Sequence, residues 1–147
     1  MSNKLYRQGV AAFIVNNDNQ LLACSRLKYA SNDWQIPQGG VEPNEDHKIA
    51  CLREIEEETG LKSIEIIAFT SKTIKYEWPP EHLRKDTPYI GQEHVYFLFR
   101  ANRLNELKQT RSFKSYKWVT FDLLVREVID FKKTSYNEAW SELSLMI

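Results

Sequence analysis

Hydrophobic positions along the chain fall into short runs typical of strands and a few longer periodic segments typical of helices. Apolar runs at 9–15 and 21–26, separated by the polar stretch NNDNQ, predict two strands joined by a turn. Further strands are predicted at 62–70, 71–78, 93–101 and 115–121, and helices at about 45–59, 122–129 and 135–146. Segments 27–40 and 79–91 contain proline and glycine and are predicted to be loops. This order predicts an α/β fold with helices packed on the faces of a mixed sheet.

The helix predicted at about Glu45 to Thr59 has recognisable ends. Asn44 is a suitable N-cap, and Gly60 is expected to end the helix. At about 100° per residue, Glu54, Glu57 and Glu58 share one face. The apolar residues on the other side are Ile49, Leu52 and Ile55, whereas Ala50 and Cys51 flank the acidic face and permit a close approach.

Composition limits the class of protein. The 147 residues suffice for one domain spanning 1–147 but hardly for two. The formal net charge is zero, so any contact with phosphate must come from a local cluster. The apolar run at 10–15 is too short to span a membrane, and the first residues do not form a signal peptide, which favours a cytoplasmic protein without a membrane partner. Cys24 and Cys51 lack metal-binding spacing and are expected to be free thiols.

The acidic face needs a physical reason, because glutamates three and four residues apart repel one another. A solvated surface is the simple alternative, but lysines are scarce on this face and do not neutralise it. Hard oxygen ligands on a rigid helix suit Mg²⁺ or Mn²⁺, which bridge carboxylates to substrate phosphates. The pattern therefore favours a divalent cation site.

The segment from Gly39 to Leu61 fits the pattern G-x5-E-x7-R-E-U-x-E-E-x-G-U, in which U is aliphatic. The specified positions are filled by Gly39, Glu45, Arg53, Glu54, Ile55, Glu57, Glu58, Gly60 and Leu61. With this pattern the chain resembles the Nudix hydrolase superfamily. Segments 6–16, 34–40, 89–100 and 116–133 are similar to the branch that holds the bacterial RNA pyrophosphohydrolases and the plant-type diadenosine tetraphosphate hydrolases.

The resemblance implies a Nudix α/β/α sandwich, with a mixed β-sheet between helices, and a metal-dependent pyrophosphohydrolase. The implied cofactor is Mg²⁺ or Mn²⁺. The implied substrate is a nucleoside polyphosphate, either the triphosphorylated 5′ end of a short RNA or a dinucleoside polyphosphate, and not DNA. Two alternatives stay open: a pyrophosphatase that removes free nucleoside triphosphates, and a catalytically silent nucleotide or RNA sensor.

The resemblance also implies roles for individual residues. Glu54, Glu57 and Glu58 would bind the metal with the backbone carbonyl of Gln38 and form the catalytic set, in which Glu57 or Glu58 alternatively acts as the base. Glu45 and Arg53 would form an ion pair that holds the loop against the helix. The implied substrate contacts are Arg7, Arg26, Lys28, Gln38, Tyr76, Tyr89, Phe131 and Lys132.

Among these substrate contacts, the basic residues would reach phosphates and Phe131 would stack a base. Tyr76 and Tyr89 are either contacts of this kind or core aromatics. Trp34 and Trp118 are expected in the core. The histidines, His47, His82 and His94, show no metal-ligand spacing and are expected to be structural or solvated.

The chain departs from the RNA pyrophosphohydrolases at one position. Ser112 stands where that branch carries a glutamate that helps to hold metal or to activate water. Glu93, on a neighbouring predicted strand, is an alternative source of a carboxylate. The departure leaves the identity of the base open.

Overall fold

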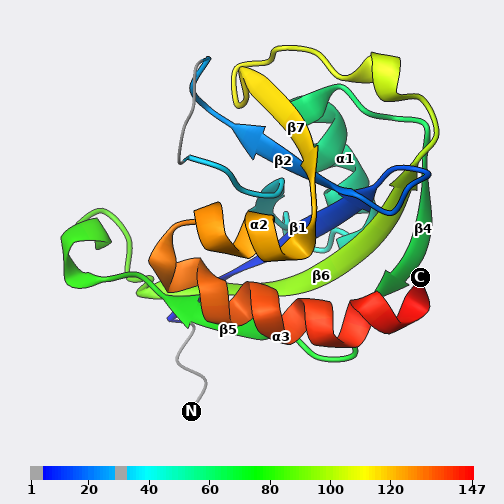
Figure 1. Cartoon of the computed structure of the whole chain (residues 1–147). Coiled ribbons are helices and arrows are strands. Elements are labelled where there is room, and N and C mark those ends of the chain that lie inside the picture. Colours follow the sequence, from blue (N-terminus) through cyan, green and yellow to red (C-terminus); the bar gives the residue numbers. More distant parts are fainter. Residues whose placement is uncertain (1–4, 29–32) are drawn as a thin grey trace.

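A computed structural model describes residues 5–28 and 33–147 of the chain (Figure 1). The described residues form a seven-stranded mixed sheet with the order β4-β6-β1-β2-β7, in which β3 also pairs with β1 and β5 with β6. The strands are β1 (Tyr6–Val15), β2 (Leu21–Ser25), β3 (Gln38–Gly40), β4 (Ile64–Phe69), β5 (Ile74–Glu77), β6 (Gly91–Ala101) and β7 (Ser115–Val119). The α-helices are α1 (His47–Thr59), α2 (Phe121–Glu127) and α3 (Lys133–Leu143).

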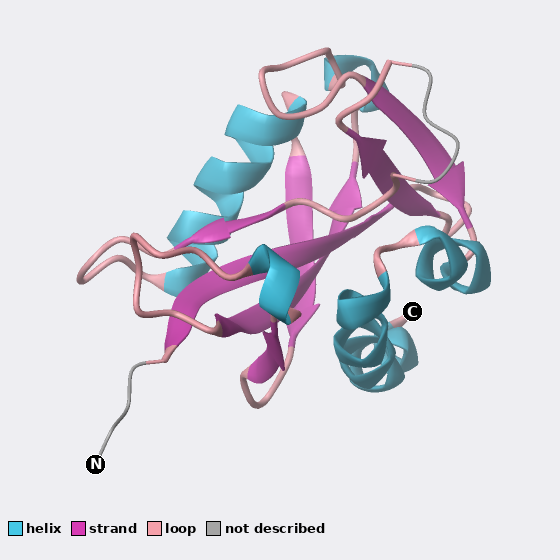
Figure 2. Ribbon diagram, turned by 90° about the vertical axis from the view of Figure 1, so that its left-hand side faces the viewer, coloured by secondary structure: helices cyan, strands magenta, loops and turns pink. Residues whose placement is uncertain are grey.

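The helices lie on both faces of the sheet (Figure 2). Helix α1 packs on one face, where Ala50, Cys51 and Ile55 join a buried cluster, and α2 and α3 pack on the other. The expected α/β/α sandwich with a mixed sheet is therefore confirmed. None of the helices in the described part of the chain is long and apolar enough to cross a membrane.

Strand β1 is the centre of this architecture because its residues 9–15 are buried between the helices on the two faces. It pairs in parallel with β6 along its whole length, from Tyr6 opposite Gly91 to Val15 opposite Arg100, and it pairs antiparallel with β2 and β3. Phe13 belongs to the cluster beneath α2 and α3, and Ile14 belongs to the cluster beneath α1. A continuous apolar run is what a strand covered by helices on both faces requires.

The structure corrects three details of the sequence prediction. Residues 38–40 were expected to be loop, but they pair with β1 as β3. The N-cap of α1 is Asp46, whose carboxylate accepts the N–H of Ile49 at 3.1 Å. Asn44 instead has a φ of 65° in the turn before the helix. The cap moves because Glu45, the expected first helical residue, is used outside the helix: its carboxylate accepts the N–H of Glu42.

The third correction concerns which side of α1 is buried. Ile55 is buried and Leu52 is partly buried, but Ile49 is 58% exposed. The small residues Ala50 and Cys51 are fully covered instead, and the Cys51 sulfur lies 4.0 Å from the carbonyl oxygen of Ala11 in β1. The acidic side of the helix therefore leans towards the sheet.

Several smaller expectations are confirmed. Gly60 ends α1 with a φ of 89° and donates its N–H to the carbonyl of Glu56. Both cysteines are free and buried. Trp34 is buried in the core, and Trp118 is partly buried against the cluster beneath α1.

The cap assignment can be tested by stability. Asp46→Ala removes the acceptor for the N–H of Ile49 and is expected to lower the free energy of unfolding by about 1 kcal/mol, measured by urea denaturation. Asn44→Gly is the control, because glycine accommodates a positive φ without strain, and it is expected to be neutral or slightly stabilising. A larger loss in Asn44→Gly than in Asp46→Ala would return the cap to Asn44.

Candidate active site

Arg53 connects the loop before α1 to the helix itself. Its guanidinium binds the carboxylate of Glu45 through two nitrogens, at 2.9 and 3.0 Å, and donates to the carbonyl of Gly40 at 3.2 Å. The expected ion pair between Glu45 and Arg53 is confirmed. The remaining nitrogen, Nη1, lies 3.1 Å from Glu54 and 3.4 Å from Glu57. Arg53 thus partly neutralises two of the three expected metal ligands.

Glu54 lies directly against β3. A Cβ atom added to Gly39 would stand 1.7 Å from one carboxylate oxygen of Glu54, so only glycine leaves room for this side chain. Burial raises the pKa of Glu54, while the positive charge of Arg53 acts in the opposite direction. The position of the Glu54 side chain therefore requires a glycine at position 39.

Glu58 is the most strongly perturbed carboxylate of the helix. It accepts the backbone N–H of Gln38 at 3.2 Å. Burial, and then the negative charge of Glu54, raises its pKa to about 8, whereas the Gln38 N–H and the charge of Lys132 lower it. Two carboxylates thus share a partly buried position where a cation would relieve their repulsion.

Glu54 and Glu58 open into one cavity of about 270 Å³. It is lined by Arg7, Gln38, Gly39, Gly40, Val41, Glu42, Arg53, Glu54 and Glu58. Glu57 is not among these residues, since its carboxylate is 57% exposed and held by Arg53. Among the described residues, no three carboxylate, histidine or cysteine side chains are already arranged as one metal site. The donors in the cavity, two carboxylates beside the Gln38 backbone, are hard oxygen ligands that fit Mg²⁺ or Mn²⁺.

A second cavity of about 320 Å³ adjoins the first, because Gln38 lines both. Four other predicted contacts line it: Arg26, Tyr76, Phe131 and Lys132. The Phe131 ring lies 5.6 Å from that of Tyr76 and 5.3 Å from that of His82. These rings form an aromatic wall.

Lys132 lines the second cavity and contacts Gln38, which lines both. Its ammonium group is 3.2 Å from the side-chain oxygen of Gln38, and its side chain is largely buried. Burial lowers the pKa of Lys132 to about 8, opposed by the charges of Asp33 and Glu58. A cation in this position is close to both the aromatic wall and the carboxylates.

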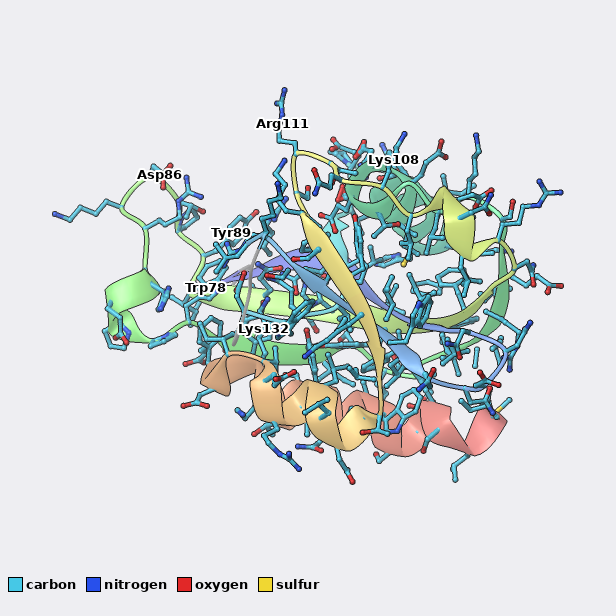
Figure 3. All side chains as sticks on the ribbon, turned by 45° about the horizontal axis from the view of Figure 1, so that its top comes forward. Trp78, Asp86, Tyr89, Lys108, Arg111 and Lys132 are labelled. Atoms are coloured by element: carbon cyan, nitrogen blue, oxygen red, sulfur yellow. The ribbon has the colours of Figure 1, made fainter. Side chains whose placement is uncertain are left out.

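Two predicted contacts are not brought to either cavity. Lys28 is exposed, and neither it nor Tyr89 belongs to the lining residues. Figure 3 shows Tyr89 with Trp78 at the base of the loop that carries Asp86, while Lys132 lies at the start of α3. Their roles stay predictions.

Sequence reasoning did not single out several residues of the second cavity as contacts. They are Asp33, Trp34, Gln35, Trp78, His82, Arg84, Gln92, Val128 and Ile129. The alternation of a strand gives one usable signal, because Trp78 follows Tyr76 by two residues. The proline-containing segment 79–91 was correctly expected to be a loop, and two of its residues, His82 and Arg84, line the cavity.

The segment around Ser112 is hydrogen-bonded to the C-terminal end of α1. The hydroxyls of Thr110 and Tyr116 donate to the backbone carbonyl of Glu58, at 2.7 and 3.2 Å. Glu93 accepts the amide of Gln8 and the hydroxyl of Thr73, and it lines neither cavity. Glu93 therefore does not bring a carboxylate to either cavity, and the glutamates of α1 stay the predicted candidates for the base.

A model of the NUDIX domain matches residues 5–139. The chain belongs to the Nudix family. It is 36% identical over 152 residues to the RNA pyrophosphohydrolase of Histophilus somni, covering 97% of this chain and 78% of that protein. It is 34% identical to the RNA pyrophosphohydrolase of Pelagibacter ubique, covering 90% and 87%, and 32% identical to the chloroplastic Nudix hydrolase 26 of Arabidopsis thaliana, covering 92% and 68%.

Solved structures of this Nudix protein's neighbours show the same fold. The E. coli dihydroneopterin triphosphate pyrophosphohydrolase aligns with a TM-score of 0.69 at 20% identity, covering 92% of this chain and 97% of that one. A C. elegans Ap4A hydrolase binary complex aligns with a TM-score of 0.68 at 19% identity, covering 96% and 99%. Together with the family match, the relatives confirm the expected branch and the class of enzyme, a pyrophosphohydrolase.

The packing of Glu54 on Gly39 gives a direct test. Gly39→Ala is expected to displace the Glu54 carboxylate and to weaken Mn²⁺ binding at least about tenfold, as measured by calorimetry, because a metal ligand is moved. Gly40→Ala is the matched control, since its added Cβ would meet only the end of the flexible Arg7 side chain. Equal Mn²⁺ affinities in wild type and Gly39→Ala would contradict a ligand role for Glu54.

Proposed function

We propose that this Nudix enzyme removes phosphate from the triphosphorylated 5′ end of RNA in a reaction that depends on Mg²⁺ or Mn²⁺. One observation carries the proposal: Gln38 joins a cavity of carboxylates to a cavity with an aromatic wall and a buried lysine. A polyphosphate in the first cavity and its nucleoside in the second would then be parts of one substrate. We choose RNA over other polyphosphates because relatives named RNA pyrophosphohydrolase match most of the chain.

The carboxylates of Glu54 and Glu58, with the Gln38 carbonyl, would hold the cation. When bound, such a cation neutralises the polyphosphate and lowers the pKa of a coordinated water. Glu57 has a different task in this arrangement. Its carboxylate is 57% exposed and lies 3.4 Å from Nη1 of Arg53, and it would turn to the substrate side to accept the proton of the attacking water.

The second cavity would orient the nucleotide. Phe131 offers its ring to the first base, and such stacking contributes about 1–3 kcal/mol. Lys132 would pair with the phosphate nearest the base, and Arg7, which lines the first cavity, with the outer phosphates. Arg26 lines the mouth of the second cavity as a further cation.

A dinucleoside polyphosphate contains the same two parts, so the two substrates must be compared directly. Triphosphorylated short RNA and diadenosine tetraphosphate are offered in parallel with Mg²⁺. Release of phosphate or pyrophosphate from RNA supports the proposal, whereas cleavage to ATP and AMP with RNA untouched reassigns the enzyme to dinucleotides. Inactivity on both would favour a nucleotide or RNA sensor.

The carboxylates can be tested in the same assay. Glu57→Gln and Glu58→Gln are expected to lower kcat by about 10²-fold or more, because each removes a base or a metal ligand. Glu56→Gln is the matched control: Glu56 is an exposed glutamate directly before Glu57 in sequence and lines neither cavity. Chelation with EDTA is expected to abolish activity, and added Mg²⁺ or Mn²⁺ to restore it. Equal rates for Glu57→Gln and Glu56→Gln would exclude Glu57 from catalysis.

The length of the RNA should matter little. The formal net charge of the chain is zero, so its long-range attraction for a polyanionic strand is weak. We expect KM to change less than about twofold when a triphosphorylated RNA is extended from three to twelve nucleotides, and to depend weakly on salt. A steep fall of KM with increasing RNA length would show that the protein binds nucleotides beyond the first few.

A further inference from the structure

Gln92 occupies a central place in the wall of the second cavity. In the sheet it stands opposite Tyr76 of β5 and opposite Arg7 of β1. Residues opposite each other on neighbouring strands project from the same face, so these side chains form one row. Gln92 is 9% exposed and lines the cavity with Phe131 and Lys132. A buried amide therefore faces the place proposed for the nucleotide.

The orientation of this amide is set by His94, two residues further along the same face of β6. The ring nitrogen Nε2 of His94 lies 2.7 Å from the side-chain oxygen of Gln92. A carbonyl oxygen only accepts hydrogen bonds, so the contact requires a proton on Nε2. Because its oxygen accepts from the ring, the amide N–H groups of Gln92 are left to donate to a different acceptor.

The surroundings of the His94 ring favour a neutral ring with its proton on Nε2. The side chain is fully buried, and burial lowers its pKa to about 3, helped by the positive charges of Lys132 and Arg7. The ring is therefore neutral and carries a single proton. Its Nδ1 has no hydrogen-bond partner among the described residues, so a proton there would be a buried, unpaired donor.

Packing also fixes the ring in place. The rings of Tyr76 and Tyr96 each lie 5.9 Å from it, edge to face. On β1 the residue opposite His94 is Gly9, and a Cβ atom there would stand 2.8 Å from the ring carbon Cδ2. The ring thus lies against bare backbone with little room to turn.

We infer that Gln92 is a substrate-contacting residue that His94 positions, so that the amide N–H groups of Gln92 donate to a phosphate oxygen of the bound 5′ nucleotide. The inference rests on the proposed function, because the phosphate belongs to that substrate. A phosphate is the acceptor that fits, since Arg7 follows Gln92 in the row and Lys132 lines the same cavity. Two cations attract the phosphate, and a fixed neutral amide adds direction.

Removing the amide should act on binding. Gln92→Leu is expected to raise KM for triphosphorylated RNA roughly tenfold with kcat within about twofold, because a contact made equally in ground and transition states is lost. Gln92→Glu should raise KM further, since a carboxylate repels phosphate. Gln8→Leu is the matched control: this glutamine of β1 bonds to Glu93 and lines neither cavity.

His94 is tested by rescue and by spectroscopy. His94→Phe should raise KM in the same direction, and His94→Gln should restore it, because an amide N–H can replace the ring donor. Thermal melting of each variant reports folding separately. In the wild type, the ¹⁵N shifts of the His94 ring should show a proton on Nε2, and the Gln92→Leu variant should lose that preference.

The outcomes separate this inference from the proposed function. Activity on RNA with an unchanged KM in Gln92→Leu overturns the inference alone, as does a wild-type ring protonated on Nδ1. A wild type that hydrolyses neither RNA nor diadenosine tetraphosphate overturns the proposed function first. A raised KM in Gln92→Leu and His94→Phe, restored in His94→Gln, supports both.

Discussion

The bidentate contact between Arg53 and Glu45 is the interaction on which the site depends. It fixes the loop before α1 against the helix, and the same guanidinium reaches the carbonyl of Gly40. Without that positive charge, the repulsion of Glu54 by Glu57 and Glu58 would be less compensated in a partly buried position. The pair is partly exposed, and its strength comes from two parallel charge-assisted hydrogen bonds. Arg53 therefore positions the loop and the carboxylates and is not itself expected to react.

The close approach of α1 to the sheet is the second constraint. Ala50 and Cys51 have small side chains, and Gly39 has none, so helix and strand come together where a larger residue would hold them apart. The approach places Glu58 within reach of the Gln38 N–H. Because α1 packs so closely on the sheet, the carboxylates of Glu54 and Glu58 are only partly open to water.

The sequence predicted the fold and the common face of the glutamates because both follow from local periodicity. Periodicity carries no information about partners, so it placed Glu57 with Glu54 and Glu58, although Glu57 pairs with Arg53, four residues before it, and does not line their cavity. It also assigned Ile49 to the apolar side, where the sheet does not reach it. The second cavity could be predicted only in part, because Trp78, His82 and Gln92 are brought to the same cavity as Phe131 by tertiary packing alone.

Gln38 has a consequence for how cation and nucleotide influence each other. Its backbone N–H binds Glu58 and its side-chain oxygen accepts from Lys132, so one residue contacts both a carboxylate of the first cavity and the cation of the second. In the proposed function, a nucleotide whose phosphate attracts Lys132 would change the electrostatic field at Glu58. Thermodynamic reciprocity then requires that an ion at Glu58 alter nucleotide affinity by the same factor. The cation and the nucleotide of the proposed function would then be energetically coupled through the side chain and the backbone N–H of Gln38.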